Sequence, residues 1–213
     1  MPQRLIRAEY LISDPARLEA GVIHDGALVV ENGQVTAAGP WAELRPRFGR
    51  LTPMGGPRDW LVLPGLINAH QHGRGVSTLE AGVADLLLEL WIPSLALYPA
   101  YDVYWNTLAA AARMLRAGIT TSVHSHSSSG PLDAYRRSVE EALAAYRTAG
   151  ARVTFALGVY DQNHLAYAAD QALLSRLPGR LRRQVQELYG VENLYLEADA
   201  YFDLFAEYWA RCG

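Results

Sequence analysis

Lysine is missing from this sequence of 213 residues, in which all 19 basic residues are arginine. The absence excludes three kinds of site within the chain: a Schiff-base lysine, a phosphate-loop lysine and a lysine-derived bridge between two metal ions. Arginine cannot take over these roles, because its guanidinium group does not lose a proton near neutral pH.

Cysteine, long apolar runs and basic stripes are also scarce or absent. The single cysteine, Cys212, cannot form an internal disulfide, which favours a reducing compartment. No signal-peptide core follows the amino terminus, and no apolar run approaches the roughly 18 residues that a membrane helix needs. The net charge of -3 comes without the basic stripe of a nucleic-acid binder. We therefore expect a cytoplasmic protein that binds neither nucleic acid nor membrane.

The amino-terminal part of the chain has the pattern of β structure. Residues 4–12 predict a strand, and residues 26–39 predict a hairpin whose turn contains Asn32-Gly33, a pair that tolerates positive φ. A Pro/Gly cluster at residues 53–57 then separates this region from the rest. We place a domain boundary near residue 60, with a small β domain in residues 1–60 and a second domain in residues 61–213.

Strands and helices alternate from residue 60 onward. Apolar or β-branched runs predict strands within residues 59–72, 119–123 and 152–157, and apolar stripes predict helices near 82–92, 101–117, 131–150, 168–186 and 201–209. In the helix that follows Pro131, Tyr135, Val139, Ala142 and Tyr146 are expected to face inward. This alternation predicts an α/β fold with a parallel sheet or barrel and helices outside it.

His70 and His72 follow the first of these strands. Side chains at positions i and i+2 of an extended segment point to the same side, so both imidazoles can converge on one ion. Imidazole suits transition metals, and the carboxyl end of a barrel strand is where active sites are built. Taken alone, a His-x-His pair is also compatible with two loop histidines that are hydrogen-bonded to backbone.

The run PGLINAHQH at residues 64–72 resembles the signature of the amidohydrolase superfamily, the metal-dependent hydrolases and deaminases built on a (β/α)8 barrel. Residues 118–121 resemble the second-strand motif of that family, and residues 155–159 lie where its third strand would be. The closest resemblance is to the aminohydrolase branch, with atrazine chlorohydrolase and the methylthioadenosine/S-adenosylhomocysteine, guanine and cytosine deaminases. The resemblance implies that His70 and His72 bind a catalytic zinc or iron ion. It also implies that residues 1–60 contribute to a β-sandwich.

Only part of the expected site is present in these residues. The family completes its metal site with histidines from strands 5 and 6 and an aspartate from strand 8, whereas this sequence contains about three βα units and no histidine after His164. We expect the acid/base residues to lie beyond residue 213, and a second polypeptide or a missing carboxyl-terminal segment to complete the barrel. Exposed sheet edges also favour association between copies.

Four further residues are candidates for substrate contact. His124 and His126 follow the second strand and would form either a polar wall of the pocket or a solvated loop. Asp161 follows the third strand and would either bind the edge of a heterocycle or cap the next helix. Trp91 would line the pocket or lie in a helix core.

The resemblance implies a metal-dependent hydrolase or deaminase that removes an amine, or another leaving group, from a carbon of a nitrogen heterocycle. A bound metal would lower the pKa of water toward about 7, and the resulting hydroxide would attack the ring carbon. Two alternatives stay open at this point. One is the hydrolysis of cyclic or acyclic amides on the same fold, and the other is a catalytically inactive binding or assembly subunit.

Overall fold

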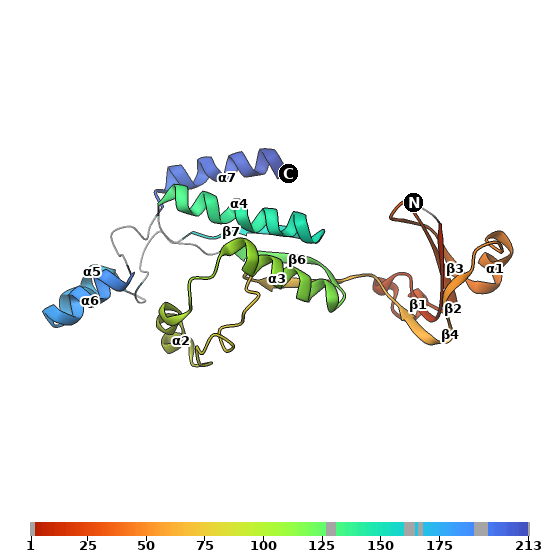
Figure 1. Ribbon diagram of the computed structural model, residues 1–213, viewed down its shortest axis with the longest axis horizontal. Helices are drawn as coiled ribbons and strands as arrows, with labels where there is room; N and C mark the ends of the chain where they lie inside the picture. Colours follow the sequence, from red (N-terminus) through yellow and green to blue (C-terminus); the bar gives the residue numbers. More distant parts are fainter. Residues whose placement is uncertain (1–2, 127–130, 160–164, 166–167, 190–195, 213) are drawn as a thin grey trace. The chain divides into compact units, whose positions relative to one another are not determined.

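The computed structural model describes residues 3–126, 131–159, 165, 168–189 and 196–212 (Figure 1). The chain divides into two compact units, Met1–Gly65 and Leu66–Gly213.

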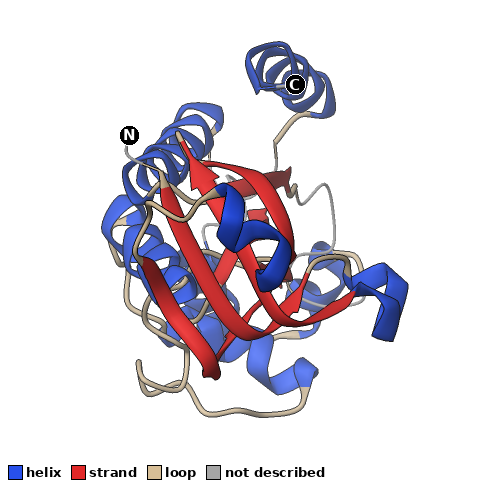
Figure 2. Cartoon of the chain, turned by 90° about the vertical axis from the view of Figure 1, so that its right-hand side faces the viewer, coloured by secondary structure: helices blue, strands red, loops and turns tan. Residues whose placement is uncertain are grey.

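The amino-terminal unit is a four-stranded sheet in the order β3-β2-β1-β4. Its elements are β1 (Arg4–Ile12), η1 (Pro15–Gly21), β2 (Val22–Glu31), β3 (Gln34–Pro40), α1 (Trp41–Arg47) and β4 (Pro53–Val62). Strand β2 pairs antiparallel with both β1 and β3, while β4 runs parallel to β1. Figure 2 shows this twisted sheet toward the viewer.

The hairpin and the first strand are confirmed. Asn32 and Gly33 have φ angles of 52° and 80° at the turn between β2 and β3, as a tight hairpin turn requires. One face of the sheet forms a small core with α1, in which Leu5, Val29 and Leu44 are almost completely buried.

The Pro/Gly cluster is not a separating segment, because residues 53–57 form the first half of β4. Pro53 to Gly56 pair with β1, and the division between the units falls after Gly65 instead. The described residues of this unit form one sheet, so the β-sandwich stays a prediction.

The second unit contains a three-stranded parallel sheet in the order β5-β6-β7. Its strands are β5 (Leu66–Gln71), β6 (Ile119–His126) and β7 (Arg152–Leu157). The helices are α2 (Leu88–Ser94), η2 (Leu95–Leu97), α3 (Val103–Arg116), α4 (Leu132–Ala149), α5 (Asp170–Arg176), α6 (Gly179–Tyr189) and α7 (Ala198–Cys212). The predicted α/β class with parallel strands is confirmed.

Several predicted boundaries were wrong. The helix expected near 82–92 spans Leu88–Ser94 instead and contains Pro93. The helix expected at 168–186 is two helices, α5 and α6, because Pro178 cannot continue the hydrogen-bond ladder. These two helices pack with each other around the buried Leu174.

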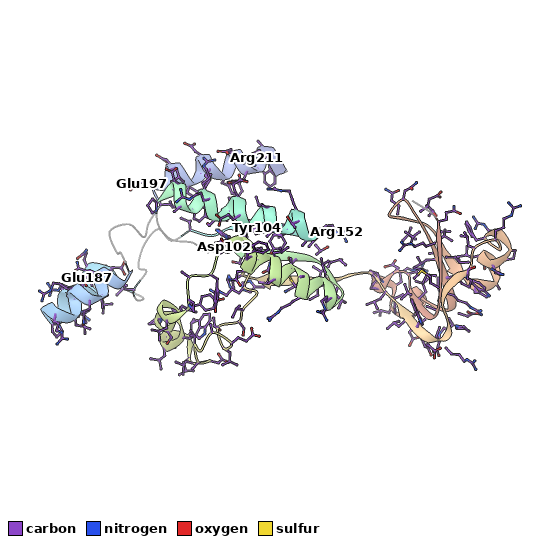
Figure 3. The ribbon with its side chains drawn as sticks, in the orientation of Figure 1. Asp102, Tyr104, Arg152, Glu187, Glu197 and Arg211 are labelled. Carbon is purple, nitrogen blue, oxygen red and sulfur yellow. The ribbon has the colours of Figure 1, made fainter. Side chains whose placement is uncertain are left out.

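Helices α3 and α4 pack against each other, and Tyr104 of α3 donates a hydrogen bond of 3.1 Å to Thr148 of α4 (Figure 3). The predicted inward face of α4 is confirmed, since Tyr135, Val139, Ala142 and Tyr146 are each no more than 1% exposed. Gly150 ends the helix with a left-handed φ of 70°.

Helix α7 packs along α4 (Figure 1). Leu204 and Tyr208 of α7 are buried against Tyr135 and Val139 of α4. Ion pairs flank this core: the Arg136–Glu207 and Arg211–Glu140 pairs are both at 2.7 Å. At the other edge, Tyr201 donates a hydrogen bond of 2.8 Å to the carbonyl oxygen of Leu157 at the end of β7.

In the part of the chain that the structure describes, no helix is both long enough and apolar enough to span a membrane.

Candidate metal centre

An irregularity in β5 determines where its histidines point. The pairing with β6 shifts register between Asn68 and Gln71. As a result, both of these side chains reach the helical layer, Asn68 contacting Met114 of α3 and Gln71 contacting Tyr146 of α4. Regular alternation from Asn68 would have sent His70 toward the helices, whereas the shift puts Gln71 on that side and so places His70 on the opposite face.

The two imidazole rings are adjacent and exposed at the carboxyl end of β5. Their centroids lie 4.8 Å apart, and the rings are perpendicular. The backbone N–H of His70 donates a hydrogen bond of 3.2 Å to Asn68 Oδ1, which closes a local turn at the site of the register shift. The structure therefore brings together the two residues predicted to bind metal, at an exposed position where β5 ends.

His72 is held in the tautomer that suits a metal ligand. Its Nδ1 lies 2.8 Å from the carbonyl oxygen of Ser125, which can only accept, so Nδ1 carries the hydrogen and Nε2 keeps its lone pair. Burial lowers the pKa of His72, and the hydrogen bond to Ser125 opposes this effect. The ring is therefore neutral near pH 7, as ligation requires.

The chemistry of this donor set fits a divalent transition metal, but only in part. Two imidazoles supply two of the three or more protein ligands that a catalytic metal needs. No group of three His, Cys, Asp or Glu side chains suited to a metal occurs within the described ranges of the chain. The remaining ligands would have to come from residues outside that part.

A hydrogen-bonded cluster lies behind the histidine pair, on the helical side of the sheet. Gln71 Nε2 donates to the hydroxyl of Tyr146 at 2.6 Å, and this hydroxyl lies 2.9 Å from His124 Nδ1. Tyr146 was predicted on the inward face of its helix, but its contact with Gln71 was not predicted. The position of Gln71 between two histidines that share the opposite face was the available signal.

His124 and His126 lie on this helical side too. They are 2% and 5% exposed, and His126 Nε2 lies 2.9 Å from Ser138 Oγ of α4. The solvated-loop interpretation was wrong, because β6 continues through both residues. The structure does not bring their rings to the exposed face that His70 and His72 occupy.

The other two candidates are Trp91 and Asp161. Trp91 is half-buried within α2, where neighbouring leucines such as Leu88 and Leu90 are exposed. Asp161 lies outside the described residues. A role in substrate contact stays a prediction for both residues, as it does for His124 and His126.

Comparison with known families identifies the chain. The model of the amidohydrolase family matches residues 61–191, which include the histidine pair and all three parallel strands. The chain belongs to the amidohydrolase family.

Curated relatives within this family are named as deaminases. The chain is 41% identical over 105 residues to a 5-methylthioadenosine/S-adenosylhomocysteine deaminase of Syntrophobacter fumaroxidans, covering 45% of this chain and 23% of the relative. It is 33% identical over 128 residues to a 5'-deoxyadenosine deaminase of Methanosarcina mazei, covering 57% of this chain and 27% of the relative. The chain therefore spans about a quarter of the length of these relatives.

Solved structures with a similar fold include amidohydrolases with different named substrates. A mutant of atrazine chlorohydrolase from Arthrobacter aurescens, complexed with zinc and atraton, matches 80% of this chain and 41% of its own, with a TM-score of 0.61 and 18% identity. Guanine deaminase from C. acetobutylicum with bound guanine matches 82% and 41%, with a TM-score of 0.55 and 16% identity. At these identities the likeness shows a shared fold alone.

Proposed function

We propose that this amidohydrolase contributes the first part of the active site of a metal-dependent deaminase that acts on a purine-type nitrogen heterocycle. The reaction would replace an amino group on a ring carbon by oxygen from water and release ammonia. The observation that carries the proposal is the exposed His70–His72 pair at the carboxyl end of β5, in a chain whose curated relatives are named as deaminases of adenine-containing compounds.

His70 and His72 would hold the ion, zinc or iron, through ring nitrogens. When bound, such an ion would make water acidic enough to supply hydroxide near neutral pH. The chain itself orients the ligands: the Ser125 carbonyl accepts from Nδ1 of His72 and leaves the lone pair on Nε2. The register shift in β5 puts Gln71, and not His70, on the side of α3 and α4.

We also propose that polypeptide outside these 213 residues completes a (β/α)8 barrel around the site. Two observations support this. The described residues supply two metal ligands where a catalytic ion needs about three or more. In addition, apolar side chains at the start of β5 are exposed: Ile67 is 72% exposed and Leu66 is 49% exposed. Covering this apolar surface would remove the free-energy cost of its contact with water.

Replacing the histidines tests the function. In the protein with its completing polypeptide, His70→Ala and His72→Ala should each abolish ammonia release from adenine nucleosides and lower the zinc content after dialysis. His24→Ala is the matched control, because His24 is an exposed histidine of β2 in the other unit. Unchanged zinc content and unchanged turnover in both variants would contradict the proposal.

A further inference from the structure

Tyr146 is a buried polar residue that the proposed chemistry does not use. It lies in α4, is 1% exposed, and its hydroxyl accepts a hydrogen bond of 2.6 Å from Gln71 Nε2. Gln71 is the residue between the two histidines of β5. The hydroxyl also lies 2.9 Å from His124 Nδ1, so helix α4 is joined at one atom to both β5 and β6.

The other end of the Gln71 amide is engaged as well. The backbone N–H of Gly73 donates to Gln71 Oε1, and this contact requires the oxygen on that side, so the NH2 group is the one directed at Tyr146. Gly73 has a φ of +68° and is buried. A Cβ atom there would fall 3.0 Å from Thr107 Oγ1 and closer still to His124 Cε1. The residues on either side of His72, Gln71 and Gly73, are therefore closely packed against side chains on the helical side of the sheet.

We propose that Tyr146 is a positioning residue for the metal-binding pair and acts through Gln71. Neighbouring side chains on a strand point to opposite faces, so an amide anchored at Tyr146 sets the direction of His70. The same amide holds the backbone on the other side of His72 through Gly73. Without the hydroxyl, Gln71 loses its helical partner at the point where the register shift already loosens the pairing with β6. The inference rests on the proposed metal-binding function, which it extends by one residue outside the site.

The competing interpretation is that Tyr146 is an ordinary core tyrosine whose hydroxyl happens to be satisfied. Both interpretations expect Tyr146→Phe to lower stability, because the part-buried Gln71 amide then keeps only its longer contact of 3.4 Å to Ser122 Oγ. They differ in zinc affinity. Groups that orient metal ligands from behind commonly change affinity by about 10- to 100-fold when they are removed. A residue that acts on packing alone changes the melting temperature and leaves the zinc affinity of the folded protein unchanged.

The experiment is a zinc titration of the protein with its completing polypeptide and of four variants, followed by calorimetry and by the side-chain NMR signals of His70 and His72. The variants are Tyr146→Phe, Gln71→Met, the double variant, and Tyr208→Phe as the matched control. The control removes a tyrosine hydroxyl that donates 2.8 Å to Glu140 of α4 and contacts neither Gln71 nor a histidine through that hydroxyl. Thermal melts of all five proteins measure the cost in stability separately.

We expect Tyr146→Phe and Gln71→Met to weaken zinc binding about tenfold each, and the double variant to lose no more than either alone, since both act on one contact. Tyr208→Phe should melt earlier and bind zinc like the parent chain. Where Tyr146→Phe does not fold, Gln71→Met carries the same test. Parental zinc affinity in Tyr146→Phe or Gln71→Met, or additive losses in the double variant, would overturn the positioning role while leaving the proposed function intact. Zinc binding by the parent that does not involve His70 or His72 would overturn both.

Discussion

Replacing His126 with glutamine should make this protein less sensitive to acid. His126 Nε2 faces Ser138 Oγ, and Ser138 donates its own hydrogen to the carbonyl oxygen of Tyr135 at 2.7 Å. Ser138 Oγ must therefore accept from His126, so Nε2 carries a hydrogen in the neutral ring. A glutamine amide can make the same donation to Ser138 without titrating.

The magnitude follows from burial of the ring. Burial lowers the pKa of His126 to about 4 from an ordinary value of 6.5. Between these two values the unfolded chain binds a proton that the folded protein excludes, so the free energy of unfolding falls as the pH falls. The contribution of His126 is complete above pH 6.5 and is lost progressively toward pH 4, and it amounts to about 3 kcal/mol.

His124 adds to the same dependence, because burial lowers its pKa to about 3. In the pH range where both histidines are protonated in the unfolded chain and neutral in the folded protein, the free energy of unfolding changes by roughly 2.7 kcal/mol per pH unit. Removing one of them should halve that slope. The window from pH 6 to pH 5 is the most informative, since it lies above the range in which carboxylates such as Glu140 take up protons.

Urea denaturation at several pH values between 7.5 and 5 measures this slope. His126→Gln should lower the parental slope by about 1.4 kcal/mol per pH unit, while His24→Gln, at an exposed position in the other unit, should keep it. A parental slope retained in His126→Gln would refute the argument from burial, as would a parental stability that does not change down to pH 5.

Two further predictions concern packing. Gly73→Ala should cost about 1–3 kcal/mol, because it combines a φ of +68° with a clash against His124 and Thr107, and thermal melts should rank it well below Gly33→Ala, whose Cβ meets open space. Leu204→Ala should cost about 2–5 kcal/mol because its side chain is 1% exposed in the α4–α7 core, whereas Leu97→Ala, 77% exposed, should change the unfolding free energy by less than about 0.5 kcal/mol.

The elements that could be predicted are those with strong local signals. The apolar stripe through Tyr135, Val139 and Tyr146 has the helical period, and it defined both the helix and the face that is buried in α4. The Asn32-Gly33 pair likewise predicted a hairpin, because few residue pairs accept the positive φ angles of that turn. In both cases the backbone geometry of a few residues is sufficient to decide the structure.

Polar residues inside strands were misread for the opposite reason. The run of serines and histidines after Val123 has the composition of a loop, yet β6 extends through His126 because Ser138 and Tyr146 of α4 provide partners for the rings. Those partners are 12 and 22 residues away in the sequence. Nothing near His124 in the chain indicates that they exist.

For the histidine pair, the sequence determines one property and the tertiary structure another. The amino-acid order alone specifies that His70 and His72 share a side of an extended segment and that their chemistry suits a transition metal. It does not specify which side. That choice depends on the register shift between β5 and β6, on the Gln71–Tyr146 hydrogen bond and on the Ser125 carbonyl that directs His72. Contacts between distant segments decide the face of a strand, because the backbone of a single strand is compatible with either one.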